Sequence, residues 1–219
     1  MPRPHVTLKL ATSLDGRIAT ASGESRWITG EAARAEVHRM RASVDAVMIG
    51  AGTARADDPS LLAHTEPLPT KQPARVVVTS RFDIPVEGKL FADLDQSPLI
   101  IFGGERAKPA VQAIFESTGA KVERIAGESV DIAAVLSRLS ELGISTVLAE
   151  GGGQLAASLL AAKAVDRLEW FRAPIILGGD GKPAVAALVL GSLADASAWQ
   201  RIALRELGPD LWESYERVS

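Results

Sequence analysis

The sequence predicts a three-layer α/β/α sandwich with a mainly parallel central sheet and an antiparallel C-terminal edge. Strand-like and helix-like segments alternate along most of the 219 residues. Several strand-like segments, such as Arg75–Thr79, are unbroken apolar or β-branched runs, which is typical of strands buried on both faces. The last two segments, 202–207 and 211–218, follow one another through Gly208-Pro209-Asp210 and indicate an antiparallel hairpin or edge.

The strands that precede this hairpin are short runs bounded by turn residues. In the first of them, Val6, Leu8 and Leu10 alternate with polar residues, so one face is apolar. Residues 75–79 and 99–102 are continuous runs in which both faces are expected to be covered, and 46–49 is a short apolar run. The predicted strands cover residues 6–11, 46–49, 75–79, 99–102, 146–149 and 168–172.

Two helices are predicted in the first third of the chain. A long loop over 13–30, rich in Gly, Ser and Thr, leads to the first helix, for which Thr29 is a candidate N-cap. A short second helix is expected after Gly50–Thr53 and ends at Asp57-Asp58-Pro59, because proline cannot continue it. The apolar residues that give the first helix its spacing are Val37, Met40 and Val44.

Three further helices are predicted downstream. Pro109 suits the first position of a helix that ends before Gly119. Asp131 is expected to cap the next helix, and the third runs over 154–162. The side chains that the Pro109 helix is expected to bury are Val111, Ile114 and Phe115.

Composition excludes several classes of function. With 24 Lys and Arg against 27 Asp and Glu, the net charge of −3 argues against a broad nucleic-acid-binding face. The absence of Cys excludes disulfides and thiolate chemistry, and the three scattered histidines form no metal-ligand motif, so no metal is expected. The longest apolar runs are far shorter than the roughly 20 residues of a membrane helix. We expect one cytoplasmic domain over residues 1–219, without a membrane segment.

The loops that follow the strands are the candidate functional site, because ligands of open α/β sheets bind beyond the carboxyl ends of the strands. The most informative loop is Glu150–Gly153, where a glycine run follows a strand and opens a helix. Glycines allow close approach of a ligand, and the amides of a helix start attract an anion such as pyrophosphate. The alternative is a tight turn that needs positive φ.

Single residues in the other loops each allow a binding role and a purely structural one. Thr53 could donate to a phosphate or cap a helix. Ser80 and Arg81 could hold the 2′-phosphate of NADPH, or Arg81 could be solvated. Trp27 could stack on a flat ring or plug its own loop.

Three charged residues complete the candidates. Lys9 lies on the polar face of the first strand, where it could fix a hydroxyl or polarise a C=N bond, or be an exposed edge lysine. Glu150 could bind a polar ligand, relay a proton or remain a solvated residue. Arg41, on the polar side of the first helix, could contact a ligand or only solvent.

Four sequence stretches together resemble the pyrimidine reductase of riboflavin biosynthesis, a family with a dihydrofolate-reductase-like fold that is often fused behind a zinc-dependent deaminase. The resemblance covers nearly the whole chain. The stretches 22–29 (SGESRWIT) and 56–59 (ADDP) are more specific than 8–19 (LKLATSLDGRIA), part of which dihydrofolate reductases share. The fourth is 150–152 (EGG).

The resemblance implies a reaction and a cofactor. It implies reduction of 5-amino-6-(5-phosphoribosylamino)uracil to 5-amino-6-(5-phosphoribitylamino)uracil, with hydride transfer from NADPH to C1 of the ribose. Lys9 and Glu150 would be the catalytic residues. The cofactor would be held by Ala11, Trp27, Thr53, Asp57, Ser80, Arg81, Gly152, Gly153, Gln154 and Leu155. The phosphorylated substrate would be held by Ser25, Arg41, Leu61, His64 and Glu150.

Two departures from the family pattern bear on these expectations. His64 stands where the family commonly has an arginine that contacts the substrate phosphate, and a histidine is mostly neutral near pH 7. The H-x-E and P-C-x-x-C signature of the deaminase is absent, so this chain would act only at the reduction step.

The resemblance also implies a homodimer, for which Leu168, Trp170 and Phe171 could face the partner. Two alternatives to the riboflavin reductase remain. One is a related NADPH reductase that acts on another pterin, pyrimidine or carbonyl substrate. The other is a nucleotide-binding module that has lost catalysis.

Overall fold

The computed structural model describes residues 2–105, 109–127 and 130–218. The chain divides into two compact units. The first contains Met1–His5 and His38–Leu148, and the second contains Val6–Val37 and Ala149–Ser219. Helix α1 (Glu31–Ala42) and strand β7 (Thr146–Glu150) continue across the boundaries of these ranges.

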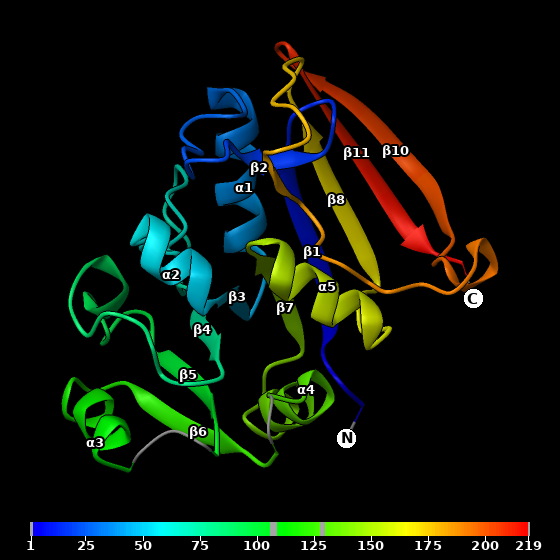
Figure 1. Ribbon diagram of the computed structural model, residues 1–219. Helices are drawn as coiled ribbons and strands as arrows, with labels where there is room; N and C mark the ends of the chain where they lie inside the picture. Colours follow the sequence, from blue (N-terminus) through cyan, green and yellow to red (C-terminus); the bar gives the residue numbers. More distant parts are fainter. Residues whose placement is uncertain (1, 106–108, 128–129, 219) are drawn as a thin grey trace. The chain divides into compact units, whose positions relative to one another are not determined.

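Parallel strands dominate the first unit. Strand β3 pairs with β4, β4 with β5 and β5 with β6, each time in parallel (Figure 1). The β-branched run of β4 is almost wholly buried, as expected for a strand covered on both faces. The elements of this unit are β3 (Ala46–Gly50), α2 (Ala51–Asp57), β4 (Ala74–Thr79), the 3₁₀ helix η1 (Lys89–Phe91), β5 (Leu99–Gly104), α3 (Pro109–Ser117), β6 (Lys121–Ile125) and α4 (Ile132–Glu141).

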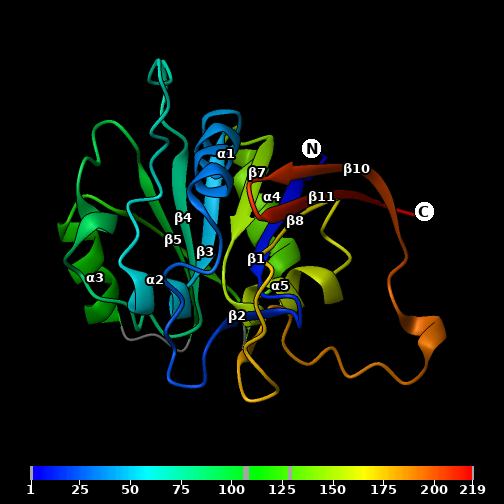
Figure 2. The ribbon, with the colours of Figure 1, turned by 90° about the horizontal axis from the view of Figure 1, so that it is seen from above.

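The second unit joins a parallel strand pair to the antiparallel edge. Strand β1 pairs in parallel with β8, and β8, β11 and β10 follow in antiparallel order. Figure 2 shows the connection from β9 to β10 as an extended loop that projects from these strands. The elements are β1 (His5–Thr12), β2 (Arg17–Ala19), α5 (Gly153–Ala161), β8 (Arg167–Arg172), β9 (Lys182–Pro183), the 3₁₀ helix η2 (Leu193–Asp195), β10 (Trp199–Leu207) and β11 (Asp210–Arg217).

The predicted fold class is confirmed: the chain is a mixed α/β protein with a mostly parallel sheet and antiparallel strands at its C-terminal edge. The predicted cap of α4 is confirmed as well, because the Asp131 carboxylate accepts a hydrogen bond from the Ala133 amide at 3.0 Å. Within the described residues, no helix combines the length and apolar character that crossing a bilayer would need.

Some local predictions are wrong. Ile114 is 49% exposed, whereas its neighbour Phe115 is buried. Consecutive helical residues are about 100° apart, so the two side chains point in different directions and only Phe115 reaches the core. Helix α1 begins at Glu31, and the Gly30 carbonyl accepts its first backbone bond, so Thr29 is not the N-cap. Val44 lies beyond the end of this helix.

Arg75, at the start of β4, is buried completely and has no carboxylate among its recorded hydrogen-bond partners. Its guanidinium donates instead to backbone carbonyls of the loop that leads to β5. The Nε–Ser97 O distance is 3.1 Å and the Nη1–Leu90 O distance is 2.9 Å, and Nη2 also donates to Ser97. Burial lowers the pKa of the Arg75 guanidinium, and the negative charge of Asp93 opposes this change. The residue therefore ties β4 to a loop that has little regular structure of its own.

Phe82 and Gly103 form a close contact beside this loop. Phe82 has a left-handed backbone, with φ 56°, and its buried ring lies against β5. A Cβ atom on Gly103 would lie only 2.0 Å from the ring of Phe82. The glycine therefore leaves the space that the aromatic ring fills.

Asp45 connects the residues that precede β3 with the start of β7. Its Oδ2 accepts hydrogen bonds from the amide and hydroxyl of Ser145 and from the amide and hydroxyl of Thr146, at 2.8–3.0 Å. Burial alone would raise the pKa of Asp45, but these donors lower it below its ordinary value. The carboxylate therefore stabilises the fold in its charged form.

We expect Asp45→Asn to lower the free energy of unfolding at pH 7 by about 2 kcal/mol, because it weakens hydrogen bonds to a charged acceptor. A carboxyl group whose pKa is lower in the folded state stabilises the folded protein at pH values above its unfolded pKa. This stabilisation is lost as the pH falls through the folded pKa. The difference between wild type and variant should therefore shrink below about pH 4. Urea titrations at pH 7 and pH 3.5 measure it. Asp95→Asn, at an exposed aspartate, is the control, and a pH-independent difference would contradict the prediction.

Candidate active site

The three glycines of the second unit, Gly151–Gly153, are called the glycine turn here and follow directly after β7, which ends at Glu150. Gly152 precedes α5 with an extended backbone, φ −73° and ψ 168°, and no side chain caps this helix start. Neither Gly152 nor Gly153 has positive φ, so the alternative of a tight turn that needs this conformation is wrong for them. A Cβ atom on Gly153 would lie 2.5 Å from the carbonyl oxygen of Pro183. Gly153 is therefore required by a close backbone approach.

Lys9 lies on β1 of the same unit and is partly exposed. Its Nζ is 5.6 Å from the centroid of the Phe171 ring, a separation that permits a cation–π contact. Two residues further on, Ala11 is partly exposed too. Among the predicted residues of the glycine turn, Gln154 is exposed and the Leu155 side chain is buried.

Trp27 is 69% exposed, so the interpretation that it plugs its own loop is wrong. The Arg34 guanidinium carbon lies 4.5 Å from the centroid of its ring, and that of Arg26 lies 5.8 Å away. Arg34 also donates to the Thr29 carbonyl at 2.9 Å, which ties helix α1 to the loop. The large exposed fraction leaves ring surface for a flat ligand. Ser25, in the same loop, is partly exposed.

In the first unit, two predicted loops lie at one edge of the sheet. Because β3 and β4 are parallel neighbours, the segment after Gly50 and Ser80-Arg81 both follow carboxyl ends. Thr53 is the third residue of α2 and Gly50 precedes this helix, so Thr53 is not its N-cap. Ser80 and Arg81 are exposed, and Asp57 is the last residue of α2.

The remaining predicted residues of the first unit lie on α1 and on the chain after α2. The Arg41 guanidinium donates to the Leu62 carbonyl at 3.2 Å. Leu61 itself is buried, with φ 59°. The His64 amide donates to Nδ1 of His38 at 3.2 Å, and the two imidazole rings meet edge to face with centroids 5.2 Å apart. These contacts bring Arg41 and His64 to one helix–loop contact, together with His38, which no sequence motif indicated as a site residue.

The candidate residues thus fall into two groups. The second unit contains Lys9, Ala11, Ser25, Trp27, Glu150, Gly152, Gly153, Gln154 and Leu155. The first unit contains Arg41, Thr53, Asp57, Leu61, His64, Ser80 and Arg81. In the part of the chain that the structure describes, no cluster of three or more histidine or acidic side chains is arranged to hold a metal ion.

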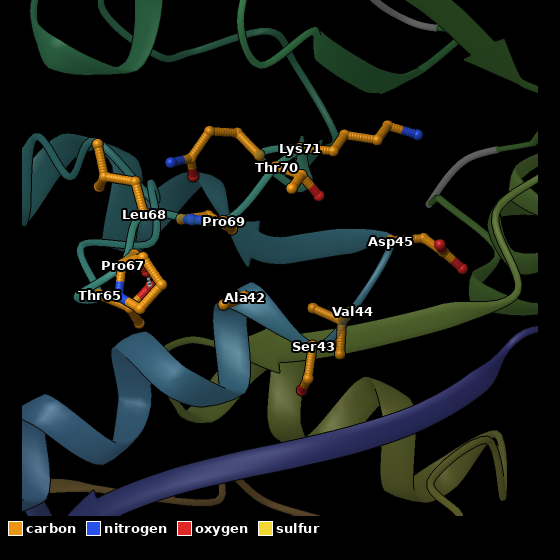
Figure 3. Close-up of a pocket in the computed structure, with 11 residues that line it drawn as sticks. Ala42, Ser43, Val44, Asp45, Thr65, Pro67, Leu68, Pro69, Thr70 and Lys71 are labelled. Carbon is orange, nitrogen blue, oxygen red and sulfur yellow. Dashed lines mark hydrogen bonds between the residues drawn. The ribbon is translucent and has the colours of Figure 1, made fainter.

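A hollow of about 540 Å³ in the first unit is lined by none of the candidate residues (Figure 3). Its walls are the residues before β3, at 42–45, and those before β4, at 65–72. It therefore lies at the amino ends of the strands, whereas the predicted ligand loops follow the carboxyl ends. We assign it no role in binding.

A smaller hollow of about 420 Å³ in the second unit adjoins the loop after β1. Asp15, on that loop, accepts from the Ser13 hydroxyl at 2.6 Å and from the amides of Leu177 and Gly178 at 3.1 and 2.8 Å. The Ser13 hydrogen bond, opposed by burial and supported by the two amides, lowers the pKa of Asp15 to about 2. The hollow is lined by Thr12, Leu14, Asp15, Gly16, Trp170, Arg172, Glu213 and Tyr215.

The architecture places the protein in the dihydrofolate-reductase-like class of α/β folds. The chain superposes on dihydrofolate reductase from Enterococcus faecalis with a TM-score of 0.52 at 15% identity, over 98% of this chain and 97% of the other. The model of the RibD C-terminal domain family matches residues 4–211, and the chain belongs to this family.

Relatives of known name agree with this assignment. The riboflavin biosynthesis protein RibD of Bacillus amyloliquefaciens is 35% identical over 95% of this chain, which spans 56% of that protein. The 2,5-diamino-6-ribosylamino-4(3H)-pyrimidinone 5′-phosphate reductase of Methanothermobacter thermautotrophicus is 37% identical over 97% of this chain and 98% of its own length. The structure of Acinetobacter baumannii RibD superposes with a TM-score of 0.85 at 29% identity, over 99% of this chain and 59% of the other.

Proposed function

We propose that residues 1–219 form a reductase domain that converts 5-amino-6-(5-phosphoribosylamino)uracil to 5-amino-6-(5-phosphoribitylamino)uracil with NADPH. The observation that carries the reduction of a phosphorylated ribosylamino-pyrimidine is the match to the Methanothermobacter reductase, because it extends over nearly the full length of both chains. The match to the RibD C-terminal domain family supports the same activity.

The residues present fit a dinucleotide with two phosphate groups and flat rings. The uncapped start of α5 offers backbone amides to a pyrophosphate. The exposed ring of Trp27 offers a stacking surface. Ser80 and Arg81, exposed beyond β4, suit the 2′-phosphate that distinguishes NADPH from NADH. When bound, the cofactor supplies the hydride, and we infer that Ala11, Thr53, Asp57, Gln154 and Leu155 complete its site.

On this proposal, the chain's own residues position the substrate and move a proton. Arg41 and His64 hold the sugar phosphate, with Ser25 and Leu61 beside the substrate. The ribosylamine opens to an imine, whose C1 accepts the hydride, and Lys9 or Glu150 assists the ring opening or the protonation. Alignment of donor and acceptor supplies most of the acceleration.

The proposal is tested by following NADPH oxidation at 340 nm, a wavelength set by the cofactor, with a panel of substrates. The panel contains the ribosylamino-uracil phosphate, dihydrofolate and simple carbonyl compounds. Turnover of the first alone supports the proposal. NADPH binding without oxidation of any substrate would instead support the nucleotide-binding module, and turnover of dihydrofolate or a carbonyl compound would identify the related reductase.

A second candidate substrate is the diamino-pyrimidinone phosphate named for the Methanothermobacter relative, which retains the amino group that deamination removes. The full-length match favours its inclusion in the panel. The ratio of kcat/KM for this compound to that for the uracil compound decides whether the chain acts before or after deamination.

We expect Lys9→Met and Glu150→Gln to separate the two candidate proton donors. Replacement of the residue that assists the reaction should lower the rate of single-turnover hydride transfer by about 100-fold, because a general acid or base contributes at least that much. Binding of NADPH, measured by quenching of tryptophan fluorescence, should stay within about twofold. A variant with a normal transfer rate removes that residue from the mechanism.

We also propose a cytoplasmic homodimer. Leu168 and Phe171 are buried within the chain itself, so the expectation that they face a partner is wrong. Exposed apolar residues of β10, Ile202 at 42% and Leu204 at 51%, are more suitable for a contact. Light scattering on the eluting protein measures the mass in solution, and a monomer at micromolar concentration would contradict this proposal.

A further inference from the structure

Two neighbouring rows of side chains cross one face of β1, β8, β11 and β10. The strand register pairs Ala11 with Phe171, Phe171 with Trp212 and Trp212 with Arg205. The register two residues away pairs Lys9 with Glu169 and Glu169 with Ser214. Because residues two apart on a strand point to the same face, the two rows lie side by side. Lys9, the candidate catalytic residue, is the first member of the second row.

The first row contains two stacked rings, which lie between Arg205 of the same row and Lys9 of the second row. The Phe171 and Trp212 rings are stacked, with centroids 5.3 Å apart and planes inclined by 11°. The Lys9 ammonium lies 5.6 Å from the Phe171 centroid, and the Arg205 guanidinium carbon lies 4.9 Å from the Trp212 centroid. Phe171 is fully buried and Trp212 is 9% exposed. The aromatic face next to Lys9 therefore has a fixed place in the core.

Glu169 fixes the second ring of this stack. Only 2% exposed, it accepts from the Trp212 indole N–H at 2.6 Å and from the Ser214 hydroxyl at 2.5 Å, and its other carboxylate oxygen is paired with Arg167. A buried carboxylate needs such partners, since an unpaired charge in the core is costly. The hydrogen bond from the indole N–H to Glu169 sets the orientation of the Trp212 ring. Because the two rings are stacked, the Trp212 ring in turn restricts the position of the Phe171 ring.

We propose that Glu169 is a positioning residue for Lys9, which it holds through Trp212 and Phe171. The inference rests on the proposed function, which places Lys9 at the reacting sugar. A lysine side chain has many rotamers, and an aromatic face beneath the ammonium restricts them. The carboxylate of Glu169 and the ring of Phe171 both attract the ammonium group of Lys9. The network thus sets the position of Lys9.

The activity test is a set of double-mutant cycles. Glu169→Gln and Phe171→Leu are each made in the wild type and in Lys9→Met, and single-turnover hydride transfer is measured with KM and the thermal midpoint. We expect each substitution to lower the transfer rate about tenfold when Lys9 is present, with KM for NADPH within about twofold. In the Lys9→Met background we expect no further decrease. Phe91→Leu, which removes a ring stacked on Phe115 in the first unit, is the control for general destabilisation.

A second measurement does not depend on turnover. Trace acetylation with acetic anhydride, read by mass spectrometry, compares Lys9 with the exposed Lys71. We expect acetylation of Lys9 relative to Lys71 to rise about threefold in Glu169→Gln and Phe171→Leu, because the amine is no longer held against the aromatic ring, and to stay constant in Phe91→Leu.

The possible outcomes separate the inference from the proposed function. Equal rate losses in both backgrounds, or unchanged acetylation of Lys9, would overturn the positioning role. An enzyme that oxidises no NADPH with the proposed substrate overturns the proposed function, and the acetylation result then decides the inference alone.

Discussion

Arg75→Met should lower the free energy of unfolding by about 3–5 kcal/mol, the largest loss of stability that we expect from one substitution outside the candidate site. Methionine fills part of the volume but has no donors. The carbonyls of Leu90 and Ser97, which accept from the guanidinium, would be left buried without their partner. The loop between β4 and β5 would lose its hydrogen bonds to the Arg75 side chain.

Urea denaturation at pH 7 measures this effect, with Lys71→Ala as a control at an exposed cation. Arg75→Lys should be intermediate, because an ammonium donates from one point and cannot reach the carbonyls on both sides. A loss below about 1 kcal/mol for Arg75→Met would show that the carbonyls find other donors.

Gly153→Ala should weaken NADPH binding by at least about tenfold and lower stability by about 2 kcal/mol. The new Cβ would stand 2.5 Å from the Pro183 carbonyl oxygen and 3.0 Å from the Ala186 amide nitrogen. Both are backbone atoms, so either the start of α5 or the 183–186 segment must move. Any such movement displaces the amides that we assign to the pyrophosphate.

Gly52→Ala is the matched control, since Gly52 also lies at the start of a helix that follows a strand. Its Cβ would meet no atom within 4 Å. Alanine is favoured over glycine in a helix, so stability should rise by about 0.5–1 kcal/mol and NADPH binding should not change. Titration of each variant with NADPH gives the dissociation constants. Equal affinities for Gly153→Ala and wild type would remove the glycine turn from the cofactor site.

The strands were predictable where one physical signal dominated. The run at β4 is β-branched and buried on both faces, and the alternation at β1 matches its buried and half-buried positions. Strand β6 was missed because Lys121, Glu123 and Arg124 interrupt its apolar pattern. Among the described strands, β6 pairs only with β5. Most of its side chains are exposed or half-buried, so they need not be apolar.

The candidate site was predictable only in part. Glycines after a strand indicated the start of α5, because the backbone amides at a helix start attract anions. The network of Glu169, Phe171 and Trp212 left no local signal, since its members meet only through the register of three strands. His38 left no local signal either. It meets His64 only because a loop 26 residues further along the chain returns to helix α1.

The contact between Phe82 and Gly103 has a consequence for how related sequences diverge. A larger residue at 103 is compatible with this backbone only after the ring at 82 has been replaced by a smaller group. Substitutions at these two sites should therefore appear jointly among homologues, and each alone should be rare.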